Sequence, residues 1–374
     1  MEFSRFITEK EPALRELLRA LCAIPAPSHH EDARAEFCLD YFRALGVTDA
    51  YIDGAKNVVC PIGDSGGPLR IFMAHTDTVF PDTEPMPMFE RDGRLCCPGV
   101  GDDTANLAVM MMVTEYIVKH APDRARNLLV VANSCEEGLG NLKGTREIVK
   151  NYGDRIGELV SFDGGLSIVN RAVGSERWKV TVSTVGGHSY GNFGNENAIA
   201  RLSKLVLELY CQTVPEIDGA KTTYNVGEIS GGTSVNTIAQ HAEMLYEYRS
   251  DSNTALAEMR DRFESIVERN RDSRAEISLE LLGVRPGMVE SRDPARLAEL
   301  TDRAAAALAR VIGREPERRP GSTDCNIPFS LGIPTVCLGL IDCGGAHTRE
   351  EYVVLDSLSD GMRICGELML GGAR

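Results

Sequence analysis

Residues 69–77 read LRIFMAHTD and combine an apolar run with a polar end. Leu69 to Met73 form a predominantly apolar run bounded by polar residues, which is typical of a strand that is buried on both faces of a sheet. His75 and Asp77 follow the run directly. Because functional residues of open α/β sheets lie beyond the carboxyl ends of the strands, the stretch predicts a buried strand with a site at its end.

Strand-like and helix-like segments alternate after this stretch. Residues 105–119 and 142–151 have helical patterns, and the apolar runs NLLVVANS and ELVSFD lie between and after them. Such alternation is typical of a sheet wrapped by helices, so the sequence predicts an α/β fold.

From about Arg177 the pattern changes. The strand WKVTVSTVG, the helix NAIARLSKLVLELY, two strands, the helix ALAEMRDRFESIVERN and the strand AEISLELLG follow in the order βαββαβ, which is that of a ferredoxin-like module. The α/β pattern then returns. At 374 residues the chain exceeds the usual size of a single core. We therefore expect a catalytic domain in two parts, 1–174 and 287–374, with an inserted domain over 175–286.

Charge and composition exclude several classes of partner. The net charge is −15, whereas nucleic-acid binding requires clustered Lys and Arg, so we expect no nucleic-acid partner. The first 21 residues contain neither an apolar signal-peptide core nor a membrane-spanning run, which predicts a cytoplasmic protein without a membrane partner. The eleven cysteines show no CxxC spacing and are expected to be buried reduced thiols, with Cys135 an alternative oxidation-sensitive site.

Two acidic segments point to a cation. Alternation along an extended segment places His75 and Asp77 on the same side, where the carboxylate can fix a metal-bound imidazole. Asp102 and Asp103 lie in PGVGDDTAN, whose glycines permit a sharp turn. A phosphate-binding loop is the alternative for this segment. Two carboxylates would repel phosphate and the GxGxxG order is absent, which favours metal binding.

Further acids and a histidine follow other predicted strands. Glu136 and Glu137 follow LLVVANSC, Asp163 follows ELVSF, and His347 follows IPTVCLGLI. Paired anions at a strand end are costly unless a cation or a proton compensates them. Two imidazoles with several carboxylates match hydrolytic zinc sites, in which one carboxylate can bridge two metals that share a water. An unligated Glu beside a ligating Glu is well placed to take the proton of that water.

Five motifs in order carry a family resemblance: HTDTV, GVGDD, CEEGLG, FDGG and AHTREEYV. Together they resemble the di-zinc exopeptidase and deacylase family, whose members include peptidase T, glutamate carboxypeptidase, aminoacylase, acetylornithine deacetylase and succinyl-diaminopimelate desuccinylase. The peptidase T branch is the most similar. The resemblance covers nearly the whole chain. It implies a zinc-exopeptidase-like mixed sheet with an inserted lid and dimerisation domain, and two divalent metal ions, zinc or alternatively cobalt or manganese.

The resemblance also implies roles for individual residues. Glu136 is the implied general base, and Asp77 the residue that orients His75. A cis peptide bond is implied between Asp102 and Asp103. The implied metal ligands are the bridging Asp102, then His75 and Asp163 at one metal, and Glu137 and His347 at the other.

Four residues of the insert match family positions. The resemblance implies that His188, in GGHSYG, enters the active site of a partner subunit and stabilises the tetrahedral oxyanion, so that the enzyme is a homodimer. Asn236 and Arg249 match polar residues of the substrate cleft. Arg285 matches a position that pairs with a substrate carboxylate. Surface ion pairing is the alternative for both arginines.

The expected function is hydrolysis of the amide bond of a short peptide by an exopeptidase. A deacylase of N-acyl amino acids is the alternative with the same chemistry. A binding protein that has lost catalysis would lack a ligand or the base, yet every family position is filled. A nucleotide-dependent enzyme rests on the α/β pattern and GVG alone. The chain departs from the family at Thr104–Asn106 and at SYGNFGN after His188, which concerns the substrate pocket rather than the metals.

Overall fold

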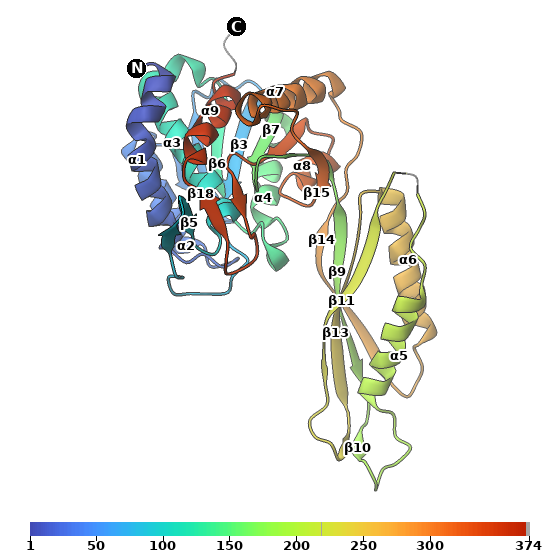
Figure 1. Cartoon of the computed structure of the whole chain (residues 1–374). Coiled ribbons are helices and arrows are strands. Elements are labelled where there is room, and N and C mark those ends of the chain that lie inside the picture. The colour runs from blue at the N-terminus through green and yellow to red at the C-terminus, as the bar shows by residue number, and fades with distance from the viewer. Residues whose placement is uncertain (218, 372–374) are drawn as a thin grey trace. The chain divides into compact units, whose positions relative to one another are not determined.

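The computed structural model describes residues 1–217 and 219–371 and divides into two compact units (Figure 1). Unit 1 comprises Met1–Ala172 and Val289–Arg374, and unit 2 comprises Val173–Met288. The boundaries expected from the sequence, at 174/175 and 286/287, each differ from these by two residues. In the described residues, no helix combines the length and the apolar character that a membrane span requires.

Unit 1 is built on a mixed eight-stranded sheet. In spatial order its strands are β1 (Tyr51–Ile52), β2 (Val58–Ile62), β6 (Leu128–Asn133), β3 (Leu69–His75), β7 (Ile156–Phe162), β16 (Thr335–Leu338), β8 (Ile168–Ala172) and β15 (Arg318–Gly321). The neighbours β6, β3, β7 and β16 run parallel. Every residue of β6 is buried, as its apolar run requires for a strand that is covered on both faces. The carboxyl ends of these four strands therefore meet at one edge.

Helices cover this sheet. They are α1 (Phe3–Cys22), α2 (Asp32–Ala44), α3 (Ala105–His120), α4 (Lys143–Tyr152), α7 (Pro294–Ile312), α8 (Asn326–Ser330) and α9 (Ser357–Met369). Helices α1, α3, α7 and α9 pack together, and every residue of α3 from Ala105 to Ile117 is buried. A helix that is mostly apolar and buried on all sides belongs inside a domain, so α3 is a core helix of unit 1.

A second, small sheet lies in unit 1 and was not predicted. It consists of β17 (Cys343–Gly344), β18 (Tyr352–Val354), β5 (Arg94–Cys96) and β4 (Phe89–Arg91), paired antiparallel in that order. Its strands have only two or three residues, too few to show a period in the sequence. The pairing of β18 with β5 brings the segment after His347 beside the segment that leads to Asp102.

The main sheet of unit 2 is antiparallel and has two helices on one face. In spatial order the sheet contains β11 (Thr222–Gly231), β13 (His241–Ser250), β9 (Gly174–Ser183) and β14 (Glu276–Arg285). The helices α5 (Ala198–Cys211) and α6 (Asn253–Arg269) connect its strands in the predicted βαββαβ order, and a short pair, β10 (Gly187–His188) with β12 (Thr237–Ile238), lies at one end (Figure 1). Tyr246, Phe263 and Met259 belong to a separate core between helices and sheet.

Candidate metal centre

The parallel strands of unit 1 deliver the predicted residues to one edge of the sheet. His75 is the last residue of β3, Glu136 and Glu137 follow β6, and Asp163 follows β7. His347 lies between β17 and β18, in the segment after β16. Residues that are far apart in the chain are thus collected where the four strands end.

Asp102 lies between the two histidines. Its Oδ1 is 3.0 Å from Nε2 of His75, and its Oδ2 is 3.1 Å from Nε2 of His347. Nε2 of His347 is also 3.2 Å from Oε1 of Glu137. A carboxylate whose two oxygens face two different imidazoles has the arrangement that a bridge between two cations requires.

Three sets of donor atoms among the described residues each lie within 4.8 Å of one another. The sets are His75, Asp102 and Asp163; Asp102, Glu137 and His347; and His75, Glu136 and Glu137. The first two share Asp102 and contain the five expected ligands, with mixed nitrogen and oxygen donors that suit zinc. The third places Glu136 among the donors as well.

The charges of this cluster shift several pKa values. Burial acts to raise the pKa of Asp102, but hydrogen bonding to His347 and His75 outweighs it, and the pKa is lowered well below its usual range. Burial, with the charge of Asp102, raises the pKa of Asp163 to about 7. Hydrogen bonding to Asp102 and Glu137 raises the pKa of His347 to about 10. So many carboxylates in a buried space call for positive charge, which bound cations would supply.

Asp77 has a wider set of contacts than its expected role beside His75 implies. Nδ1 of His75 lies 3.0 Å from the backbone carbonyl oxygen of Asp77 and 3.4 Å from its carboxylate. The same carboxylate accepts hydrogen bonds from the backbone N–H groups of Glu136 (3.0 Å) and Glu137 (2.9 Å), and from the hydroxyl of Ser28 (2.6 Å). Asp77 is fully buried, so it fixes the turn with both glutamates as well as the imidazole.

Glu351 holds the other acidic turn. Its carboxylate accepts hydrogen bonds from the backbone N–H groups of Gly99 (2.9 Å), Gly101 (2.7 Å) and Asp102 (2.8 Å). Burial raises the pKa of Glu351 to about 7, although these donors favour its charged form. The N–H groups that a phosphate loop would offer are thus taken by a side chain of the protein, which decides against the nucleotide-binding alternative.

Asp103 belongs to none of the three donor sets. Its carboxylate accepts hydrogen bonds from the backbone N–H of His75 (3.0 Å) and from the side chain of Asn106 (2.6 Å). Asn106 also binds the carbonyl oxygen of Gly164 (3.0 Å) and the backbone N–H of Leu340 (2.9 Å). The bond between Asp102 and Asp103 is cis, as the resemblance implies. Asn106, at which the chain departs from the family, therefore links the turn of Asp103, the turn after β7 and the segment after β16.

Several buried polar residues of the site were not predicted from the sequence. Glu31 is fully buried and accepts hydrogen bonds from the backbone N–H and the thiol of Cys135 (both 3.1 Å), and burial raises the pKa of that thiol to about 12. A raised pKa lowers the fraction of thiolate, which favours a buried reduced thiol over the alternative that Cys135 is sensitive to oxidation. Asp324 accepts hydrogen bonds from Asn133 and Thr145. The signal for Glu351 was its place in AHTREEYV, whereas Glu31 and Asp324 have none.

Unit 2 carries the remaining predicted residues at its two ends. Arg249 and Arg285 both pair with Ser175, near the connection to unit 1. Arg249 forms a two-point ion pair with Glu247 at 2.8 and 3.0 Å, and Arg285 is buried, with 6% of its surface exposed.

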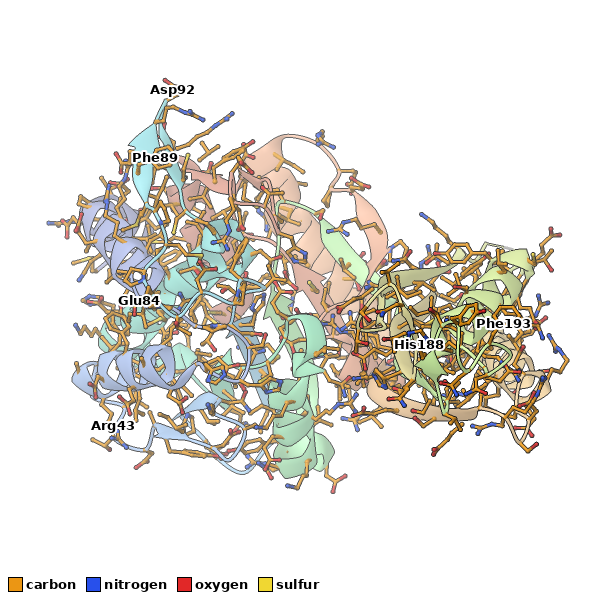
Figure 2. All side chains as sticks on the ribbon, turned by 90° about the horizontal axis from the view of Figure 1, so that it is seen from below. Arg43, Glu84, Phe89, Asp92, His188 and Phe193 are labelled. Atoms are coloured by element: carbon orange, nitrogen blue, oxygen red, sulfur yellow. The ribbon has the colours of Figure 1, made fainter. Side chains whose placement is uncertain are left out.

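His188 and Asn236 lie at the opposite end. The backbone N–H of Ser189 donates to the carbonyl oxygen of Asn236 at 2.9 Å. Figure 2 views unit 2 from this end, where the labelled His188 and Phe193 lie. Nδ1 of His188 accepts from the backbone N–H groups of Tyr190 and Gly191, at 3.3 and 3.2 Å, so the ring proton is on Nε2.

The sequence profile described as Peptidase family M20/M25/M40 matches residues 71–371, which is more than half of the chain. The chain belongs to this family. The relatives described below include a desuccinylase, an aminopeptidase and a dinuclear metal-binding peptidase, so the chain is a hydrolase of the M20 metallohydrolase class. This finding agrees with the family resemblance of the five motifs.

Individual M20 relatives are distant. Succinyl-diaminopimelate desuccinylase of Corynebacterium glutamicum is 27% identical over 361 residues, covering 92% of each chain. Aminopeptidase PepT of Bacillus cereus shares the fold with a TM-score of 0.71 at 21% identity, over 96% of this chain and 98% of that one. A dinuclear metal-binding M20 peptidase of Bacillus subtilis has a TM-score of 0.63 at 15% identity, over 97% and 98%. These solved structures establish the mixed α/β fold.

Proposed function

We propose that this M20 protein is an exopeptidase that hydrolyses an amide bond of a short peptide with two bound divalent metal ions. The observation that carries the proposal is the position of Asp102, whose two carboxylate oxygens face His75 and His347 separately. Asp163 and Glu137 complete the two donor sets. When bound, the metals supply Lewis acidity toward the substrate carbonyl and lower the pKa of water.

The side chains of the protein divide the remaining work. Glu136 takes the proton of the attacking water and passes it to the leaving amine. Its carboxylate lies beside Glu137 and His75 but is in neither of the two donor sets that contain Asp102, so it is available as a base. Asp77 fixes the backbone of Glu136 and Glu137, so the base and one ligand keep a constant separation. Glu351 does the same for the turn that carries Asp102.

Deacylation of an N-acyl amino acid is the second candidate. The observation that favours it is the sequence relationship, since the desuccinylase of Corynebacterium glutamicum is similar over 92% of this chain. Both reactions break an amide bond through a tetrahedral intermediate of the same type. In either case Arg285, planar and buried, would pair with a carboxylate of the substrate.

We further propose that the active enzyme is a homodimer in which His188 serves the partner subunit. Arg249 and Arg285 pair with Ser175, and Ser183, eight residues along the same strand, lies toward the His188 end. At about 3.3 Å per residue the two groups are separated by roughly 25 Å, too far for both to contact one small substrate. A second copy would remove this conflict, and Nε2 of His188 would then donate to the oxyanion.

The edge of the unit 2 sheet supports this assembly. Strand β11 is an edge strand of ten residues, with Ile229 54% exposed. On α5, Leu207 is 68% exposed and Tyr210 is 50% exposed, and the Tyr210 ring lies 5.4 Å from that of Tyr224 on β11. Exposed apolar side chains beside a free strand edge favour pairing with another chain.

Zinc and the cytoplasm are the proposed metal and location. Imidazole and carboxylate donors suit zinc, although cobalt and manganese accept similar donors. Every cysteine lies in the described part of the chain, and all are free thiols. Reduced cysteines are typical of the cytoplasm.

The test is a hydrolysis screen of chelator-stripped protein reloaded with Zn²⁺, Co²⁺ or Mn²⁺. The substrates are dipeptides, tripeptides, and N-acetyl and N-succinyl amino acids. We expect the metal-loaded protein to hydrolyse peptides and the stripped protein to be inactive. Preference for acylated amino acids would select the second candidate, and hydrolysis of no substrate with any metal would refute both.

A further inference from the structure

A hollow of about 250 Å³ adjoins the candidate metal centre within unit 1. Its walls are mainly apolar, from Pro27, Val79, Phe80, Pro81 and Leu139, and they also include His29 and the candidate ligand Glu137. Pockets that hold whole ligands usually measure about 300–1,000 Å³. The hollow is therefore of a size for one side chain rather than for an entire peptide.

The loops that form the hollow are tied to each other and to the site. Pro27 and Thr78 form a β-bridge, and the backbone N–H of Thr78 donates to the carbonyl oxygen of Ala26 at 2.8 Å. The hydroxyl of Ser28 donates to the carboxylate of Asp77 at 2.6 Å and lies 3.3 Å from the carbonyl oxygen of Glu137. Because the same contacts fix the hollow and the candidate metal ligand, the hollow keeps a defined position beside the reacting bond.

The chemistry of the walls selects an apolar occupant. Val79 is 39% exposed and Leu139 is 51% exposed, although both are apolar, while Phe80 is buried at 7%. Contact with an apolar side chain would remove Val79 and Leu139 from water, which is favourable in proportion to the area buried. A charged side chain would lose hydration there, and an acidic one would also face the carboxylate of Glu137.

We propose that this hollow binds an aliphatic or aromatic side chain of the substrate residue next to the scissile amide. The inference rests on the proposed function and deepens it, because it names the substrate class: amides flanked by an apolar residue. In an apolar pocket, one methylene gained or lost by the substrate changes kcat/KM by about 10–200-fold. Glycine substrates, which cannot fill the hollow, would be the poorest of a neutral series.

The experiment uses the metal-loaded full-length enzyme and two series of dipeptides. One series varies the residue on the acyl side of the amide and the other varies the residue on the amine side, each through Gly, Ala, Leu, Phe, Asp and Lys. In one of the two series kcat/KM should rise at least 10-fold from Gly to Leu, with Asp the poorest. Flat profiles in both series would overturn the proposal.

A charged substitution then locates the preference in the hollow. Leu139→Asp should reduce the Leu-to-Gly ratio of kcat/KM by about 10-fold or more. Leu331→Asp is the matched control, because Leu331 is 53% exposed, lies outside the hollow, and receives the same chemical change. An unchanged ratio in Leu139→Asp, or an equal loss in Leu331→Asp, would contradict the assignment.

A binding measurement separates this proposal from the proposed function. Calorimetry with metal-loaded Glu136→Gln, which lacks the proposed base, compares the affinities of the same Leu and Gly dipeptides without turnover. Tighter binding of the Leu dipeptide that disappears in Glu136→Gln with Leu139→Asp supports the hollow, even if the wild-type enzyme hydrolyses neither dipeptide. Equal affinities for Leu and Gly would reject the hollow, even if wild-type hydrolysis supports the proposed function.

Discussion

The carboxylate of Glu351 accepts a hydrogen bond of 2.8 Å from the backbone N–H of Asp102. It also accepts from Gly99 and Gly101, so one buried side chain fixes three N–H groups of the turn that carries the central carboxylate of the site. Contacts behind a metal ligand set the orientation of the ligand, and their removal typically costs 10–100-fold in metal affinity.

Glu351→Gln should therefore weaken metal binding by about 10–100-fold. The glutamine amide keeps one acceptor oxygen. Its NH₂ group, however, would face a backbone N–H group that is bonded to the carboxylate in the wild type and would lose its acceptor. Metal titration by calorimetry measures the change. The matched control is Glu350→Gln, because the neighbouring Glu350 is exposed. Wild-type affinity in Glu351→Gln would show that the turn holds Asp102 without this carboxylate.

Glu136→Gln should reduce kcat by about 10²–10⁴-fold while the protein keeps its metal. Glutamine has nearly the shape of glutamate but cannot accept the proton of water. Steady-state kinetics gives the loss, and elemental analysis of the dialysed protein gives the metal content. A variant that loses metal and activity in parallel would instead identify Glu136 as a metal ligand. The metal analysis is needed because Glu136 belongs to the third donor set, with His75 and Glu137.

His188→Ala should abolish most turnover without unfolding the protein, since the side chain is exposed. Mixing it with Glu136→Ala tests whether the site is shared. Random exchange gives half mixed dimers with one intact site each, so recovery should approach roughly a quarter of wild-type activity. Sedimentation velocity establishes the oligomeric state. Dimers that exchange subunits without recovering activity would refute the shared site.

Glu158→Gln should destabilise unit 1 without removing any of the candidate metal ligands or the proposed base. The fully buried Glu158 contacts Arg70 (3.1 Å), Arg296 (2.8 Å) and Arg303 (2.9 Å). The substitution removes the buried negative charge that all three arginines contact, at a cost of about 3 kcal/mol, the lower end of the usual range because the arginines are partly solvated. Thermal unfolding measures this loss. Glu299→Gln is the control, because Glu299 is exposed and lies 3.9 and 4.0 Å from two of the same arginines.

The pH dependence of this difference has a definite sign. Burial acts to raise the pKa of Glu158, but the charges of Arg303 and Arg70 outweigh it, and the pKa is lowered. A lowered folded-state pKa gives stabilisation that is full above the unfolded value of about 4.3 and is lost as the pH falls through the folded value. The gap in stability between wild type and Glu158→Gln should be widest at pH 7 and should shrink steadily as the pH falls below about 4. A gap that widens in acid would contradict this assignment.

The strands of the unit 1 sheet and the kinds of residue at their ends were predictable from local patterns in the sequence. The strands β3, β6 and β7 consist mainly of buried apolar residues. Such runs favour a strand that is covered on both faces, so local composition was enough to predict them. Because parallel strands place their carboxyl ends on one edge, His75, Glu137 and Asp163 could be expected to meet. The βαββαβ order of unit 2 followed from periodicity in the same way.

The groups that hold these residues in place depend on the three-dimensional fold. Glu351 reaches Gly99 across 252 positions of the chain, and Glu31 reaches Cys135 across 104. The hollow is likewise assembled from three separate loops, around Pro27, Val79 and Leu139. Hydrogen bonds and cavities depend on distances of a few ångströms between segments, and these distances exist only after the sheet has been assembled. Local patterns carry the preference of each segment for strand or helix, but they contain no information about those distances.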